Sequence, residues 1–145
     1  MSIPAAKPST LIKPTLETKF HIDHGWWSRR PKEDWRIELL SHLLPEQRER
    51  LSQSEEGHKV DHIDPETGEV KQLDELGLAI QMAAKDPNFI NPHTSLVDCI
   101  FRVFLANDNL PLSPIELADR TGRPATTILK TLSGGTIYKG IRPAH

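Results

Sequence analysis

The sequence predicts a small α+β protein that is mainly helical and carries one β-hairpin in its N-terminal part. Apolar side chains recur every three or four residues in several segments that begin with helix-capping residues. Residues 64–68 read Asp-Pro-Glu-Thr-Gly, a turn composition, between two strand-like runs. Near the C-terminus, a glycine separates two short helical segments. With 145 residues, the chain is long enough for one domain, or for two very small modules that share a core.

Composition divides the chain into a tail and two modules. Three prolines among small polar residues predict an extended or disordered tail over residues 1–15. We expect an α+β N-terminal module over residues 16–90 and a second module over residues 94–145, separated by the linker signal Asn91-Pro92. No apolar run has the length of a membrane span or of a signal-peptide core, so we expect a cytoplasmic protein without a membrane partner.

The N-terminal module begins with a strand and a tryptophan-bearing helix. Apolar and β-favouring residues alternate over residues 16–22, which predicts a short strand. Pro31 suits the first position of a helix, and the apolar stripe that follows contains Trp35. Residues 46–53 predict a second, more polar helical turn or two.

A β-hairpin and another helix follow. Residues 60–63 and 69–73 flank the turn at residues 64–68, in which Pro presets φ and Gly68 fills a left-handed position. Asp74 is placed to cap a helix that runs to about Lys85.

The C-terminal module begins with the most hydrophobic helix of the chain. Thr94 or Ser95 starts it, and its stripe is wide enough for a central core helix: Leu96, Val97, Ile100, Phe101, Phe104 and Leu105. The capping box from Ser113 to Glu116 starts the next helix, which ends at Gly122. A last helix is expected over residues 124–132, followed by a strand over residues 136–139.

The two C-terminal helices have the spacing of a helix-turn-helix. The small side chain of Ala118 allows the second helix to approach the first, and Gly122 supplies the turn with positive φ. Ile128 then lies on the buried face of the second helix. The opposite face of that helix is the one that helix-turn-helix proteins place in the major groove of DNA.

Three helices, a glycine turn and a β-rich end over residues 94–142 resemble the winged helix-turn-helix superfamily of DNA-binding domains. The resemblance implies that the DNA-binding residues lie on or beside the recognition helix (Arg123, Thr126, Thr127 and Lys130) and on or near the wing (Lys139 and Arg142). Arg123 departs from the apolar residue usual after the turn glycine. The helix also has few of the side chains that read base edges bidentately, which implies weak base discrimination. The whole chain also resembles a small family of bacterial proteins, a resemblance that implies no function.

Charge is unevenly distributed. Residues 110–145 contain five basic and two acidic residues, a net charge of +3, whereas residues 1–109 contain 13 basic and 18 acidic residues, a net charge of −5. Positive charge therefore falls in the segment expected to contact phosphates. The overall charge of −2 argues against a strongly basic, sequence-blind coat protein.

The chain shows no pattern typical of a metal or cofactor site. His58 and His62 lead into a predicted strand, in which four residues span about 13 Å, and His21 and His24 would point to opposite faces. Cys99, the single cysteine, is expected to be a buried, inert thiol. No phosphate loop and no nucleophile elbow is present, so we expect a protein that is not an enzyme.

The tryptophans are a possible partner surface, although we expect them mainly in the core. Trp35 is predicted to be buried together with one of Trp26 and Trp27, leaving the other to contact a partner.

These observations predict a non-catalytic protein that binds double-stranded DNA, as a transcription regulator or an accessory DNA-binding subunit. The N-terminal module would then dimerise, sense a signal or recruit a partner. The alternative is an adaptor whose winged helix docks another protein in a larger assembly, an interpretation that the acidic overall charge and the Thr-rich helix favour.

Overall fold

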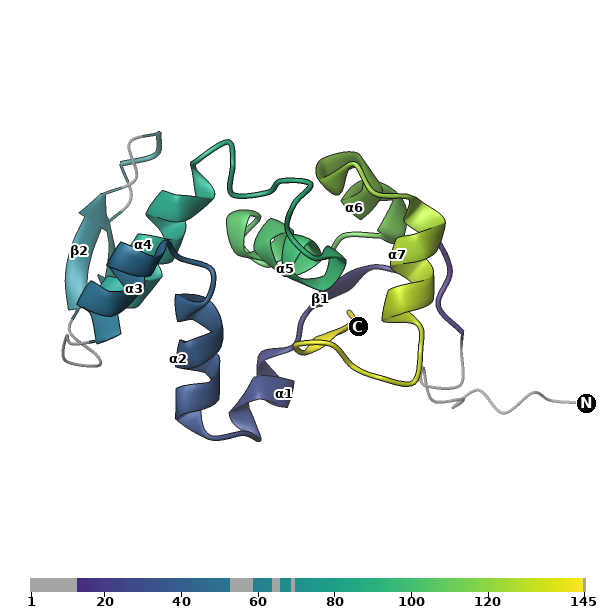
Figure 1. Cartoon of the computed structure of the whole chain (residues 1–145), viewed down its shortest axis with the longest axis horizontal. Helices are drawn as coiled ribbons and strands as arrows, with labels where there is room; N and C mark the ends of the chain where they lie inside the picture. The colour runs from purple at the N-terminus through teal and green to yellow at the C-terminus, as the bar shows by residue number, and fades with distance from the viewer. Residues whose placement is uncertain (1–12, 53–58, 64–65, 69, 145) are drawn as a thin grey trace, which may run out of the picture.

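The computed structural model describes residues 13–52, 59–63, 66–68 and 70–144 (Figure 1). Within them the chain forms, in order, β1 (Phe20–Ile22), α1 (His24–Ser28), α2 (Lys32–Leu40), α3 (Pro45–Ser52), β2 (Lys59–Ile63), β3 (Val70–Asp74), α4 (Glu75–Ala84), α5 (Leu96–Ala106), α6 (Pro114–Thr121), α7 (Ala125–Leu132) and β4 (Ile141–Pro143). Most of the predicted tail, residues 1–12, lies outside the described residues. None of the helices in the described ranges is both long enough and apolar enough to cross a bilayer.

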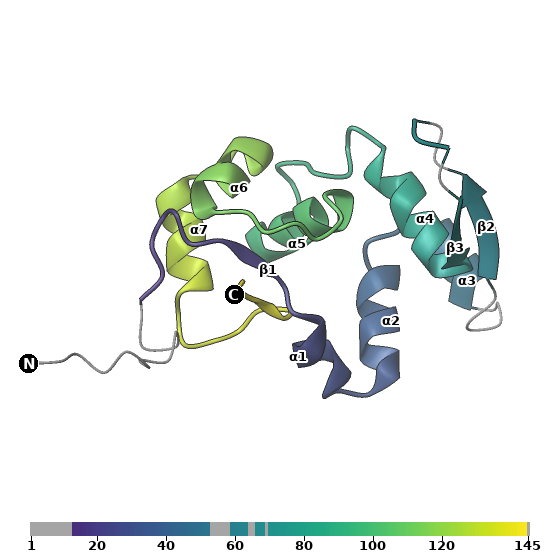
Figure 2. The same ribbon diagram turned by 180° about the vertical axis from the view of Figure 1, so that it is seen from behind.

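One end of the elongated molecule is built from α3, α4 and the hairpin of β2 and β3, and the other from α6 and α7 (Figures 1 and 2). The hairpin is antiparallel and pairs Ile63 with Val70, which confirms the predicted hairpin. Gly68 has the predicted left-handed conformation, with φ of 74°, whereas Asp64 and Pro65 of the turn lie outside the described residues.

Helix caps appear where the sequence predicts them. The Asp74 carboxylate accepts a hydrogen bond from the backbone N–H of Gly77, 2.6 Å away, and so begins α4. Ser95 caps α5 in the same way, through the backbone N–H of Asp98. The capping box that joins Ser113 and Glu116 is complete at the start of α6.

The two ends of the described chain meet in a small sheet. β1 lies beside the short yellow strand β4 near the C-terminus (Figure 2). The two strands pair antiparallel, with Phe20 opposite Pro143, and Leu112 bridges to the other edge of β1. The strand predicted over residues 16–22 is therefore confined to Phe20–Ile22. This sheet ties the N-terminal strand to the segment that follows α7.

The prediction of a strand over residues 136–139 is wrong. Those residues form a loop, and the strand begins five residues later, at Ile141 of β4. Lys139 and Gly140 have φ of 54° and 75°, so the backbone turns sharply just before β4. The loop thereby delivers Ile141 to its pairing partner on β1, Ile22.

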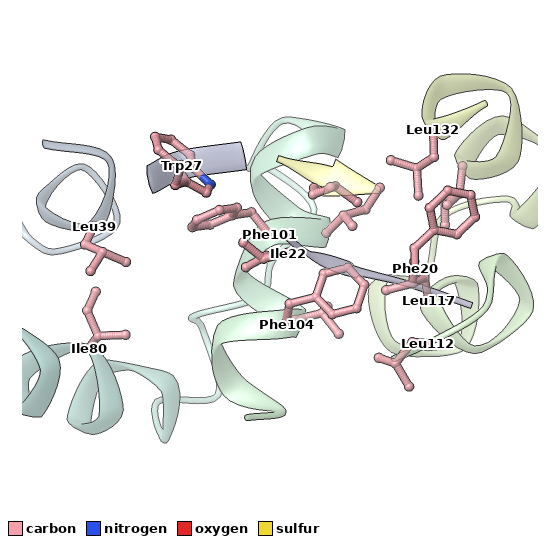
Figure 3. Close-up of a cluster of buried hydrophobic side chains, with 14 of the residues drawn as sticks. Phe20, Ile22, Trp27, Leu39, Ile80, Phe101, Phe104, Leu112, Leu117 and Leu132 are labelled. Carbon is pink, nitrogen blue, oxygen red and sulfur yellow. The ribbon is translucent and has the colours of Figure 1, made fainter. Parts of the chain in front are cut away.

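A continuous cluster of buried apolar side chains runs along the molecule (Figure 3). Phe20, Phe101 and Phe104, all fully buried, form its middle, where α5 packs beside β1. Leu39 and Ile80 face each other at one end, and Leu117 and Leu132 lie at the other (Figure 3). Both halves of the chain therefore contribute to one core.

The single cysteine is buried, as the sequence predicts. Cys99 has no exposed surface and lies on α5. Its burial raises the pKa of the thiol above its ordinary value, although nearby Arg123 and Arg102 act in the opposite direction.

The tryptophans divide as the sequence predicts for the adjacent pair. Trp27 is buried and lies edge-on to Phe101, with 6.4 Å between the ring centroids. Trp26 is half-buried, and the guanidinium of Arg30 lies 3.4 Å above its ring. Trp35, expected in the core, is only half-buried and packs against the edge of the cluster.

Candidate nucleic-acid interface

The helices α6 and α7 form a pair joined by a tight turn. Gly122 adopts the left-handed conformation, with φ of 72°, and its backbone N–H donates to the carbonyl oxygen of Ala118 at 2.9 Å. Ile128 and Leu132 are buried against the core, as the sequence predicts for Ile128. This burial fixes the rotation of α7 and decides which of its side chains face the solvent.

Three of the predicted DNA-binding residues lie on the exposed side of α7. Thr126, Thr127 and Lys130 are all exposed. The helix begins after Pro124, which provides no side-chain cap. No capping side chain therefore accepts from the N–H groups of the first turn, and these groups can donate to an anion. One helix thus presents hydroxyls, one ammonium group and the positive end of its dipole on a single face.

Arg123 is directed inward instead. Its Nη2 atom donates to the carbonyl oxygens of Thr94, at 2.6 Å, and Pro92, at 3.1 Å. The side chain therefore ties the turn between α6 and α7 to the segment that precedes α5. Arg123 therefore has a structural role within the protein.

Lys139 is also engaged within the protein. Its ammonium lies 2.5 Å from a carboxylate oxygen of Asp98 and 2.8 Å from one of Glu38. Burial alone would lower the pKa of Lys139, but the hydrogen bonds to Asp98 and Glu38 outweigh it and raise the pKa above its ordinary value. The lysine links the loop after α7 to α2 and α5.

Arg142 lies on β4, where an ion pair with Asp23 at 3.4 Å offsets its charge. Asp23 is also the N-cap of α1. Of the four charged residues expected to contact DNA, the structure therefore leaves Lys130 on the exposed face and gives Arg123, Lys139 and Arg142 partners within the protein.

Sequence reasoning missed a polar network around His42. The Nδ1 atom of this buried histidine accepts from Nε of Arg102 at 3.0 Å, so the proton is on Nε2, which donates to Glu38 at 2.7 Å. The ring stacks on Phe101 with 5.0 Å between centroids. Burial acts to raise the pKa of Glu38, but the hydrogen bonds from His42 and Lys139 prevail and lower it.

This network also has the composition of a metal site. Ligand atoms of Glu38, His42 and Asp98 lie within 4.8 Å of one another. The ammonium of Lys139 contacts both carboxylates, and Nε2 of His42 has its lone pair occupied by a proton. The donor set is thus satisfied by ion pairs and does not fit a metal. The local sequence does not indicate this network, because its residues lie far apart along the chain.

The histidines weighed as metal ligands in the sequence do not assemble in the described part of the chain. His21 is half-buried on β1, and His24 lies edge-on to Trp35, with 5.3 Å between centroids. His58 lies outside the described residues.

The surroundings of α7 are mixed in character. Ile137 and Tyr138, in the loop after the helix, are each 41% exposed. On α6, Glu116 pairs with Lys19, and this hydrogen bond together with that from the Ser113 backbone lowers the pKa of the carboxyl to about 2. The basic side chain of Arg120 donates to Asn107 at 3.1 Å.

Comparison of the chain with protein-family models, with curated proteins and with solved structures finds no match.

Proposed function

We propose that the chain is a non-catalytic DNA-binding protein, a transcription regulator or an accessory DNA-binding subunit, that places α7 in the major groove of a duplex. The observation that carries the proposal is the pair α6 and α7, joined at Gly122, with Ile128 buried and the opposite face of α7 exposed. This is the arrangement that a helix needs to enter a groove while its other face is anchored.

In this proposal, α7 makes the contacts itself. Lys130 neutralises a phosphate, and the N-terminal N–H groups of α7 receive another phosphate. Thr126 and Thr127 contact phosphates or a thymine methyl group on the floor of the groove. Arg123, Lys139 and Arg142 act as positioning residues, because their partners lie within the protein.

The winged-helix part of the proposal rests on the small sheet. β4 follows α7 in the chain, as the first strand of a wing would, and Leu112 precedes α6. The strand between them is β1, from the other end of the chain. In this arrangement the tip of the wing is formed by two chain segments that meet at Lys19 and Ala144, joined by a backbone hydrogen bond of 2.8 Å.

A single exposed lysine on α7 predicts weak, moderately salt-dependent binding. Each phosphate neutralised by a cationic side chain contributes a slope of about −0.9 to the dependence of log K on log salt, so Lys130 alone gives a slope of about −1. Titration of a fluorescein-labelled random duplex, followed by anisotropy at about 50 mM and about 200 mM salt, measures this slope.

Two matched variants each reverse the charge of one lysine. Lys130→Glu changes the exposed face of α7, and Lys85→Glu changes an exposed residue at the end of α4. We expect Lys130→Glu to weaken binding about tenfold and Lys85→Glu to change it less than about twofold. No saturable binding at low salt, or an equal effect of both variants, would show that α7 is not the DNA-contacting element.

The alternative function, an adaptor that docks a protein on the same face, is favoured by one observation. Ile137 and Tyr138 expose apolar surface beside a helix that carries a single cation. A pull-down with and without nuclease separates the two functions. Partners that persist after nuclease treatment and are lost in Tyr138→Ser would favour the adaptor.

The N-terminal module carries the proposed homodimer or partner contact. Exposed apolar side chains lie on two of its helices and on the turn before α3: Ile37 on α2, Met82 on α4 and Leu44 just before α3. Sedimentation equilibrium of the wild type and of Met82→Glu tests this contact, because a charge in an apolar interface weakens association.

A further inference from the structure

A cavity of about 530 Å³ opens between α1, α2 and the start of α4. Its volume lies in the range of pockets that hold small molecules. The elements that line it, α1, α2 and α4, lie away from α7 (Figure 1), and the proposed DNA contacts do not involve it.

The wall of the cavity contains flat aromatic rings. Trp27 and Trp35 both line it, with 5.1 Å between their ring centroids, and His24 lies edge-on to Trp35. Leu39 and Leu76 add an apolar surface. Such a lining favours a planar ring, because indole rings offer large stacking surfaces at low entropic cost.

Positive charge surrounds the aromatic wall. Arg30, Lys32 and Arg36 line the cavity, against one carboxylate, Asp74. The Asp74 carboxylate already accepts from the N–H of Gly77 at the start of α4. One nitrogen of Arg36 donates to the carbonyl oxygen of Leu51 at 2.8 Å, which holds the guanidinium in place at the cavity. The charge of the lining therefore complements an anion.

Gly77 lines the cavity in the first turn of α4, where its backbone N–H donates to the Asp74 cap. A larger side chain at this position would change the lining of the cavity at the start of α4.

The cavity is connected to the loop that follows α7. The indole Nε1 of Trp27 donates to the carbonyl oxygen of Lys139 at 2.9 Å. Gly140 packs so closely on the same indole that a Cβ there would lie 2.8 Å from Nε1. A ligand that moves Trp27 therefore displaces the backbone at Lys139 and Gly140.

We propose that this cavity binds a small planar aromatic molecule that carries an anionic group. The ring stacks against Trp35 with the edge of Trp27 beside it, since the two indoles lie at 63° to each other, and the anion lies at Lys32 and Arg36. Occupancy is transmitted through Trp27 to the loop between α7 and β4. This binding site is independent of the proposed DNA binding.

Two pairs of probes test the site with the full chain and without DNA. Each pair keeps the ring and differs in charge: AMP with adenosine, and indole-3-acetate with indole-3-acetamide. Indole and backbone N–H signals of the ¹⁵N-labelled protein report binding, since the chain has three tryptophans. We expect at least one anion to shift the indole signals of Trp27 and Trp35 and the amide of Gly140 with a saturable curve, about tenfold more tightly than its uncharged counterpart.

Three variants distinguish binding in the cavity from non-specific binding to the protein surface. Lys32→Gln should weaken the anion several-fold and leave the uncharged probe unchanged, whereas Lys85→Gln, on an exposed residue outside the cavity lining, should change neither. Gly77→Leu should abolish binding without lowering the melting temperature, because leucine is the better helix former.

Three results would overturn the proposal. One is the absence of indole shifts with both anions up to about 5 mM, a limit that corresponds to about 3 kcal/mol of binding. The second is equal affinity for the charged and uncharged members of both pairs. The third is unchanged binding in a folded Gly77→Leu variant.

Discussion

Lys130 and Lys139 lie nine residues apart, on α7 and on the segment that follows it, and the fold uses them differently. Lys130 is exposed on a face with two threonines. Lys139 bridges carboxylates of α2 and α5, and its side chain is only 30% exposed. A segment that is rich in basic residues therefore does not always form a basic surface. Burial and ion pairs within the protein determine which of its cations a phosphate can contact.

The largest expected effect contrasts the two faces of α7. Ile128→Ala should lower the free energy of unfolding by about 3 kcal/mol, because it removes methyl groups from a fully buried position. Thr127→Ala, on the exposed face, should change stability by less than about 0.5 kcal/mol. Urea denaturation measures both, and similar losses would mean that α7 is rotated from the orientation described here.

The second contrast is between the glycine in the turn before α7 and the glycine at the end of the loop that follows it. Both Gly122 and Gly140 have positive φ, but only Gly140 packs against indole rings. Gly122→Ala should cost about 1 kcal/mol of backbone strain, and Gly140→Ala about 3 kcal/mol, because its methyl group also displaces Trp26 and Trp27. Thermal unfolding with tryptophan fluorescence reports both quantities. A Gly140→Ala protein as stable as Gly122→Ala would contradict the contact.

The third contrast tests the two lysines directly. Lys139→Met leaves Glu38 and Asp98 without their shared cation and should cost about 2 kcal/mol, whereas Lys130→Met should cost less than about 0.5 kcal/mol. Lys139→Arg keeps the charge and should recover part of the loss. Equal costs for the two methionine variants in urea titrations would remove the distinction between an internal and a free lysine.

The smallest effect is the pH dependence of the Lys139 network. Because the folded protein lowers the pKa of Glu38, this group contributes stability above the ordinary glutamate pKa of 4.5 and loses it as the pH falls through the lowered value. The raised pKa of Lys139 contributes stability below its ordinary value of 10.5, which is lost as the pH rises through the raised value.

Comparing the free energy of unfolding of the wild type with that of Glu38→Gln at several pH values isolates the contribution of Glu38 to the pH dependence of stability. The stability difference should be largest between about pH 6 and about pH 9 and should shrink as the pH falls below the ordinary glutamate pKa of 4.5 and through the lowered value. A difference that stays constant with pH would show that the carboxylate is not charged and paired in the folded protein.

Local signals in the sequence were sufficient for most helices. The capping box at Ser113, the cap at Asp74 and the glycine at position 122 act within one helical turn, so their effect can be read from neighbouring residues. The turn that ends at Gly68 defines the hairpin for the same reason.

Long-range contacts were not predictable. The strand over residues 136–139 was misplaced because β4 is defined by its partner β1, more than a hundred residues away, and by two consecutive residues with positive φ. The partners of Lys139 lie 41 and 101 residues away, so the sequence around this lysine does not indicate that its ammonium is paired within the protein. His42 was missed for the same reason, since it meets Arg102 only in the fold.

A map of the backbone amide shifts, recorded when a short DNA duplex is added to the ¹⁵N-labelled protein, tests most directly whether α7 contacts DNA. We expect the largest shifts on residues 125–131, with Thr126, Thr127 and Lys130 at their centre. Arg142 on β4 should move little. Shifts centred on β4, or confined to the N-terminal module, would contradict the assignment of α7 as the DNA-contacting helix.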